Sequence, residues 1–155
     1  MDRALQLASA IERTVSGPMW HGPALTDLLD GVPHARAAAR PIAGAHSIWE
    51  IVLHTIAWAE IGRARIKGQR TGDPTPAEDW PPVAATDEDA WHRAVKQLDS
   101  SYRLLAAEAR ELDEARLEAA VPGLDYSVAV LLHGIVEHGT YHGGQIALLK
   151  RALGA

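Results

Sequence analysis

Residues 47–68 read SIWEIVLHTIAWAEIGRARIKG, and this stretch carries the clearest start and end signals of a helix in the chain. Ser47 followed by Glu50 predicts a capping box, in which each side chain bonds a backbone N–H that the first turn leaves unpaired. Apolar side chains recur at helical spacing as far as Ile66, and Gly68 stands where helices commonly end. The stretch therefore predicts a long helix whose broad apolar face must pack against other helices.

Three further long helices follow from the same periodicity, together with a short one near the N-terminus. They are expected at about residues 2–15, 23–29, 86–112 and 127–153. Thr86 and Asp89 are expected to cap the helix that they precede. A connection at residues 69–85 holds four prolines, which forbid a regular helix there and leave a segment long enough to cross the bundle. No strand pattern competes, so we expect one all-α domain, residues 1–155, folded as a four-helix bundle.

The bulk composition excludes several classes of protein. Of the 155 residues, 47% are hydrophobic and 23% are charged, as in ordinary globular domains. The formal charge of −5 argues against a nucleic-acid partner, because an acidic surface repels phosphates. The longest nearly apolar run, residues 51–59, is far shorter than the roughly 20 residues that span a bilayer, so no membrane partner is expected. The N-terminal sequence MDRALQ has no basic stretch leading into an apolar core, which indicates a cytoplasmic protein.

Two histidines stand on the apolar stripe of the last predicted helix, where a core helix usually carries leucine. His138 and His142 are four residues apart, so their rings project from one helix face, about 6 Å apart. Two neutral imidazoles in a core each need a hydrogen-bond partner, and one cation satisfies both. On an exposed face the same spacing would usually be a coincidence. Since the chain has no cysteine, a metal here needs nitrogen or oxygen ligands.

The helix at residues 47–68 offers a third imidazole in a similar setting. His54 follows Ile51 and precedes Trp58 on the same apolar face. Three core-facing histidines on two helices predict a site for one divalent metal ion, with His54, His138 and His142 as its ligands. A di-iron site of the ferritin type is excluded, because these helices lack the E-x-x-H motifs that such a site needs.

The other five histidines have simpler interpretations. His34 and His92 are expected at the surface. His46 is expected to be solvated or to cap the helix after it, and His133 to be a packing residue turned away from the pair. His21, in the sequence WHGP, could reach the site from a tight break in the chain. None of these five is predicted to be a metal ligand.

Three polar residues near the predicted ligands have open roles. Glu50 either only caps its helix or also orients the ring of His54, one turn further along. Tyr141 and Gln145 flank the histidine pair and fit an open coordination position, the core or its rim. No catalytic residue can be assigned, because the sequence identifies no general base.

Two segments together resemble the DinB-like (YfiT-like) superfamily. They are HSIWEIVLH at residues 46–54 and EHGTYHGGQI at residues 137–146, and the likeness extends to WHGP at residues 20–23. The resemblance implies a four-helix bundle of up-down-down-up topology with a three-histidine metal site, whose ligands fall on His54, His138 and His142. It also implies a homodimer and a divalent ion, with Zn²⁺ or Ni²⁺ favoured and Mn²⁺ or Fe²⁺ as alternatives.

The predicted site indicates an enzyme that acts on a small molecule. Three imidazoles leave coordination positions free, and a metal held in this way lowers the pKa of a bound water or thiol. The resemblance favours a metal-dependent transferase that uses a low-molecular-weight thiol. A metal-dependent hydrolase uses the same residues, and the non-enzymatic alternative is a metal-stabilised dimeric bundle that binds a small molecule in a stress response. The choice between transferase and hydrolase depends on the resemblance alone, whereas a polar, solvent-connected pocket above His54 and His142 would favour an enzyme over the non-enzymatic alternative.

Overall fold

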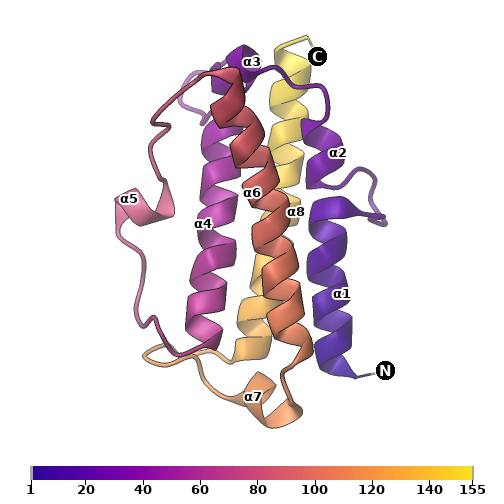
Figure 1. Cartoon of the computed structure of the whole chain (residues 1–155), viewed down its shortest axis with the longest axis vertical. Coiled ribbons are helices and arrows are strands. Elements are labelled where there is room, and N and C mark those ends of the chain that lie inside the picture. The colour runs from indigo at the N-terminus through magenta and orange to yellow at the C-terminus, as the bar shows by residue number, and fades with distance from the viewer. Residues whose placement is uncertain (1, 155) are drawn as a thin grey trace.

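The computed structural model describes residues 2–154, and four long helices dominate it (Figure 1). They are α1 (Arg3–Ser16), α4 (Ile48–Ile66), α6 (Glu88–Arg110) and α8 (Val128–Ala152). Within residues 2–154 no strand forms, and only two isolated bridges pair loop residues. The prediction of an all-α helical bundle is therefore confirmed. None of the described helices has both the length and the apolar character that crossing a membrane requires.

The four helices form a ring of neighbours around one core. Helix α1 packs against α6 and α8, and α4 packs against the same two helices from the other side. In Figure 1, α4 and α6 run downward, whereas α1 and α8 run upward. The segment at residues 67–87, hereafter the crossover, returns the chain from the lower end of α4 to the upper end of α6. These two consecutive long helices therefore run in the same direction.

Side-chain caps begin the helices that carry the histidines. The Ser47 hydroxyl accepts a hydrogen bond from the Glu50 N–H, and the Glu50 carboxylate accepts one from the Ser47 N–H, which confirms the predicted capping box of α4. Ser127 is the N-cap of α8, and its side chain likewise accepts a hydrogen bond from a backbone N–H of the first turn. The predicted cap of α6 was wrong by one residue. Asp87 is the N-cap and accepts from the Ala90 N–H at 2.9 Å, because a carboxylate at this position reaches a first-turn donor directly.

Short helices fill the connections, and three of them were not predicted. Helix α2 (Leu25–Leu29) was expected, but α3 (His34–Ala38), α5 (Pro76–Asp79) and α7 (Glu114–Glu118) were not. The expectation that prolines exclude a helix from residues 69–85 is corrected by α5. Pro76 occupies its first turn, where a missing N–H costs nothing, and Thr75 and Glu78 form a capping box around it.

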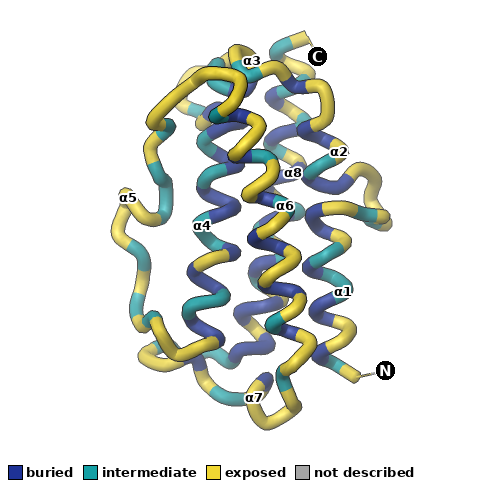
Figure 2. The backbone as a smooth tube through the Cα atoms, viewed as in Figure 1, coloured by how far each residue is buried: buried dark blue, intermediate teal, exposed yellow. Residues whose placement is uncertain are grey.

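The residues that the long helices turn toward one another are buried and form the hydrophobic core (Figure 2). Gly139 of α8 decides how closely that helix can lie to its neighbours. A Cβ added at Gly139 would lie 2.5 Å from Thr14 Cγ2 of α1 and 2.8 Å from Tyr102 Oη of α6. The glycine therefore lets α8 lie close to α1 and α6, at a position between His138 and His142 in the sequence.

Candidate metal centre

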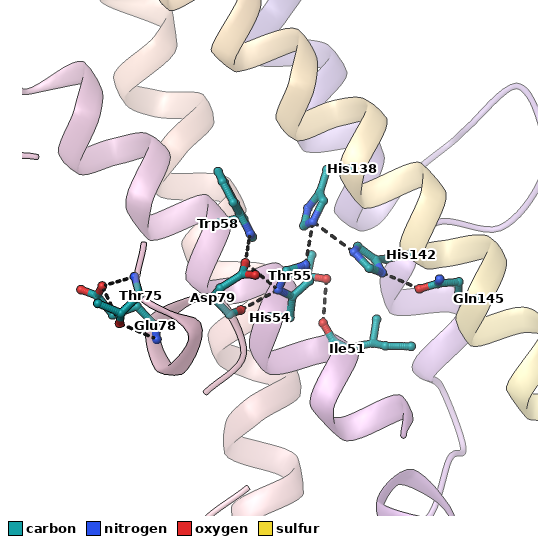
Figure 3. A network of polar contacts seen from close by, with 10 residues as sticks. All are labelled: Ile51, His54, Thr55, Trp58, Thr75, Glu78, Asp79, His138, His142 and Gln145. Carbon is teal, nitrogen blue, oxygen red and sulfur yellow. Dashed lines mark hydrogen bonds and ion pairs between the residues drawn. The ribbon is translucent and has the colours of Figure 1, made fainter. Parts of the chain in front are cut away.

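Three histidine side chains meet between α4 and α8 (Figure 3). The Nε2 atom of His138 lies 2.9 Å from Nε2 of His54 and 3.0 Å from Nε2 of His142. The candidate ligand atoms of the three residues all lie within 4.8 Å of one another. His54 and His142 are buried, at 5% and 4% exposure, and His138 is half-buried. The structure thus brings together the three histidines that the sequence singled out.

Two carbonyl groups determine which ring nitrogens carry protons. His54 Nδ1 lies 2.5 Å from the backbone oxygen of Asp79, and His142 Nδ1 lies 2.6 Å from Oε1 of Gln145. Because a carbonyl oxygen only accepts, each Nδ1 must be the N–H of its ring. The Nε2 atoms of His54 and His142 therefore present lone pairs toward His138. This is the pattern in which a second group orients a metal-binding imidazole.

The donor set fits a divalent cation. Nitrogen ligands at about 2.0–2.1 Å in tetrahedral geometry are separated by roughly 3.3 Å, close to the two Nε2 separations. Without a cation, at least two converging lone pairs share one small space. Among the described residues, Nδ1 of His138 is also buried without a hydrogen-bond partner. A cation bound at the Nε2 atoms leaves this Nδ1 unpaired, but it gives the converging Nε2 lone pairs a common partner, so the cluster could hold a metal ion.

Burial keeps the three imidazoles in the form that binds metals. Desolvation, together with the neighbouring imidazoles, lowers the pKa of His138 to about 3. Desolvation likewise lowers the pKa of His142 to about 4, and it lowers the pKa of His54 although Asp79 partly opposes this. All three rings are therefore neutral near pH 7, with lone pairs available for coordination.

The crossover supplies two neighbours of His54 that sequence reasoning missed. Besides its carbonyl contact, Asp79 accepts a hydrogen bond from Trp58 Nε1 at 2.7 Å through Oδ1. The indole of Trp80 stacks on the His54 ring, with centroids 3.8 Å apart and planes 3° from parallel. The ring of His46 covers the opposite face of Trp80 at 3.6 Å. No periodic signal marks Asp79 or Trp80, because Asp79 ends the one-turn helix α5 and Trp80 directly follows it.

A family model of the DinB superfamily matches residues 20–146 of the chain, and this range includes all three clustered histidines. The chain belongs to the DinB superfamily. No curated protein and no solved structure matches it.

The polar residues near the triad of this DinB-superfamily chain now have defined places. Glu50 caps α4 and forms an ion pair with Arg40, which supports the simpler of its two interpretations. Gln145 holds His142, whereas Tyr141 is 63% exposed and contacts the His142 ring edge-on at 5.1 Å. Gln145 is thus part of the support of the site, and Tyr141 lies at its rim.

The other five histidines stay outside the cluster. His92 is exposed, as expected, and His34 is partly exposed at the start of α3. His46 is exposed but also stacks on Trp80. The expectation that His133 packs was wrong: it is exposed, since five residues before His138 the helix faces solvent. His21 is exposed and borders a small cavity beside α2 and not the triad.

A cavity of about 830 Å³ lies beside the triad of the DinB-superfamily chain. All three histidines line it, together with Asp79, Trp80 and Gln145. Tyr141 and Leu148, 63% and 55% exposed, also line it and connect it to solvent. A small molecule could therefore approach the three imidazoles from this side.

Proposed function

We propose that this protein is a divalent-metal-dependent enzyme of the thiol S-transferase type, with His54, His138 and His142 as its metal ligands. The observation that carries the proposal is the convergence of three neutral imidazoles on the wall of an open cavity. Three protein ligands leave coordination positions free for a substrate, as in catalytic metal sites. Imidazole ligands suit Zn²⁺ and Ni²⁺, and Mn²⁺ or Fe²⁺ are the alternatives.

The residues of the chain would prepare the site and the ion would supply the chemistry. When bound, a divalent ion lowers the pKa of a thiol and so favours the reactive thiolate. Asp79 and Gln145 hold two of the rings in the required tautomer, and Trp80 covers one face of His54. The sulfur then forms a bond to an electrophilic carbon of the second substrate. The thiol proton is released, and the leaving group departs with the electron pair of the bond that breaks.

A metal-dependent hydrolase is the second candidate, and one feature of the cavity favours it. Among the described lining residues there is no lysine or arginine to bind the carboxylates that many cellular thiols carry. Water needs no such contact, so the same triad could serve a hydrolytic reaction. The homodimer and the role in a stress response remain predictions.

Metal analysis of the purified protein tests the proposed ligands. We expect about one divalent ion per chain in the wild type and less than about a tenth of that in His54→Ala and His142→Ala. His133→Ala is the matched control, because it removes an exposed histidine of α8 outside the cluster. If stoichiometric metal survives both cluster substitutions, the site assignment is wrong.

Rate measurements distinguish the two reactions. The metal-loaded protein would be assayed for conjugation of a model electrophile with several thiols and for hydrolysis of an activated ester. We expect a conjugation rate that a chelator abolishes and added metal restores. A metal-dependent rate with the ester alone would replace the transferase with the hydrolase, and no metal-dependent rate in either assay would leave the non-catalytic alternative.

A further inference from the structure

The walls of the cavity beside the triad are built largely from apolar and aromatic side chains. Most come from α4, α8 and the crossover, and others from the loop before α4; six that contribute are Ile51, Trp58, Trp80, Leu131, Ile135 and Leu149. Its volume of about 830 Å³ falls in the range of ordinary small-molecule sites. An apolar surface of this kind gains free energy when it is covered by an apolar ligand.

The charges around the cavity disfavour an anionic occupant. Among the described lining residues, the only carboxylate is that of Asp79, which already accepts a hydrogen bond from Trp58. No ammonium or guanidinium group of the described lining faces the cavity. Away from the triad, a carboxylate or phosphate buried against these walls would lose its hydration without gaining an ion pair. The polar groups of the lining are instead gathered at the triad.

Gly134 leaves additional room beside His138. It lies one turn before His138 on α8 and lines the cavity. A Cβ added at Gly134 would meet no atom within 4 Å, so close packing does not require a glycine at this position. Gly144 of the same helix is equally open, but it does not line the cavity. A substitution at Gly134 therefore tests whether a ligand occupies the space beside His138, and the same substitution at Gly144 is its control.

We infer that the cavity binds an uncharged, predominantly apolar molecule that reaches the metal through one donor group, with its apolar part beside Gly134. The inference rests on the proposed metal site and specifies the substrate class of that site. The donor group would bind the metal ion at the three imidazoles, where polar atoms of the lining converge. Any charged part of such a molecule stays at the solvent end of the cavity, near Leu148.

Binding of metal-chelating probes to the Co²⁺-loaded protein tests the inference. The probes are acetohydroxamate, octanohydroxamate and the eight-carbon hydroxamate that ends in a carboxylate, and binding is followed by the visible absorption of Co²⁺. We expect octanohydroxamate to bind at least about tenfold more tightly than acetohydroxamate, because its chain covers apolar walls. The terminal carboxylate is expected to remove most of this gain.

Two glycine substitutions locate the effect in the cavity. Gly134→Leu is expected to weaken octanohydroxamate binding at least about fivefold more than acetohydroxamate binding, since its side chain fills open space in the cavity that only the longer probe needs. Gly144→Leu adds the same side chain outside the cavity and is expected to leave both affinities unchanged. Both changes replace glycine inside a helix, so both variants are expected to fold.

The outcomes separate this inference from the proposed metal site. If the protein fails to bind Co²⁺, or if His54→Ala binds it equally well, the metal site itself is wrong. If Co²⁺ binds at the triad but chain length makes no difference, the apolar substrate class is overturned and the metal site stands. The same holds if no hydroxamate changes the Co²⁺ spectrum, or if the two leucine variants behave alike.

Discussion

The backbone oxygen of Asp79 accepts a hydrogen bond from Nδ1 of His54 at 2.5 Å, so the crossover fixes the ring that α4 presents to the site (Figure 3). The Asp79 carboxylate is in turn held by the indole N–H of Trp58 at 2.7 Å. Trp58 and His54 are one turn apart on α4, and both reach the same crossover residue. This arrangement sets the tautomer and the orientation of the only candidate ligand that α4 contributes.

Trp58→Phe tests this support. The substitution keeps an aromatic ring but removes the N–H donor, so Asp79 loses one of its two anchors. We expect the affinity for Zn²⁺ to fall about tenfold, as for other groups that orient metal ligands. The measurement is competition with a chromogenic chelator. Trp91→Phe is the control, because the indole N–H of Trp91 donates to the backbone oxygen of Val32. Neither residue is hydrogen-bonded to the triad or to Asp79. Equal losses in both variants would contradict the role of Asp79.

The periodic parts of the chain could be predicted, and the crossover could not. His54, His138 and His142 occupy core-facing positions of regular helices. In such helices the spacing of apolar residues along the sequence identifies the side that faces the core. The contacts of Asp79 and Trp80 depend on how residues 67–87 fold back onto α4, and no spacing encodes that path. The one-turn helix α5 was missed for a related reason, since proline forbids helix interiors but favours first turns.

Gln145 gives a second test of the tautomer argument. Its Oε1 accepts from His142 Nδ1 at 2.6 Å. Gln145→Leu removes the acceptor, and we expect the affinity for Zn²⁺ to fall about tenfold, or more. Gln145→Glu keeps an acceptor at the same reach and is expected to retain or increase the affinity, because a carboxylate is a stronger acceptor for the imidazole N–H. A leucine variant that binds Zn²⁺ as tightly as the wild type would show that His142 needs no such partner.

The close approach of α8 at Gly139 predicts a stability effect that is separate from metal binding. Gly139→Ala forces a methyl group against Thr14 and the Tyr102 hydroxyl, at 2.5 and 2.8 Å before any relaxation. We expect the free energy of unfolding of the metal-free protein to fall by about 1–3 kcal/mol. Gly144→Ala, on the same helix with open space around it, is expected to raise it by about 0.5–1 kcal/mol. Urea denaturation in the presence of a chelator measures both, and a neutral Gly139→Ala would mean that α8 can shift outward freely.

The buried imidazoles predict how the metal-free protein responds to acid. Burial lowers the pKa of His138 to about 3 and that of His142 to about 4, whereas an unfolded histidine titrates near 6.5. Between about pH 4 and pH 6.5 the unfolded chain therefore binds more protons than the folded protein does. Stability consequently rises with pH through this window and is lost as the pH falls through it, with no contribution from these groups above it.

His138→Gln isolates the contribution of one ring. The substitution removes a group that takes up a proton on unfolding, so the free energy of unfolding should depend less steeply on pH by up to about 1.4 kcal/mol per pH unit in that window. Urea denaturation with a chelator at about pH 7.5, 6 and 5 gives the slopes of the wild type and the variant. An unchanged slope would show that His138 is protonated in the folded protein, which is incompatible with three neutral imidazoles converging on one cation.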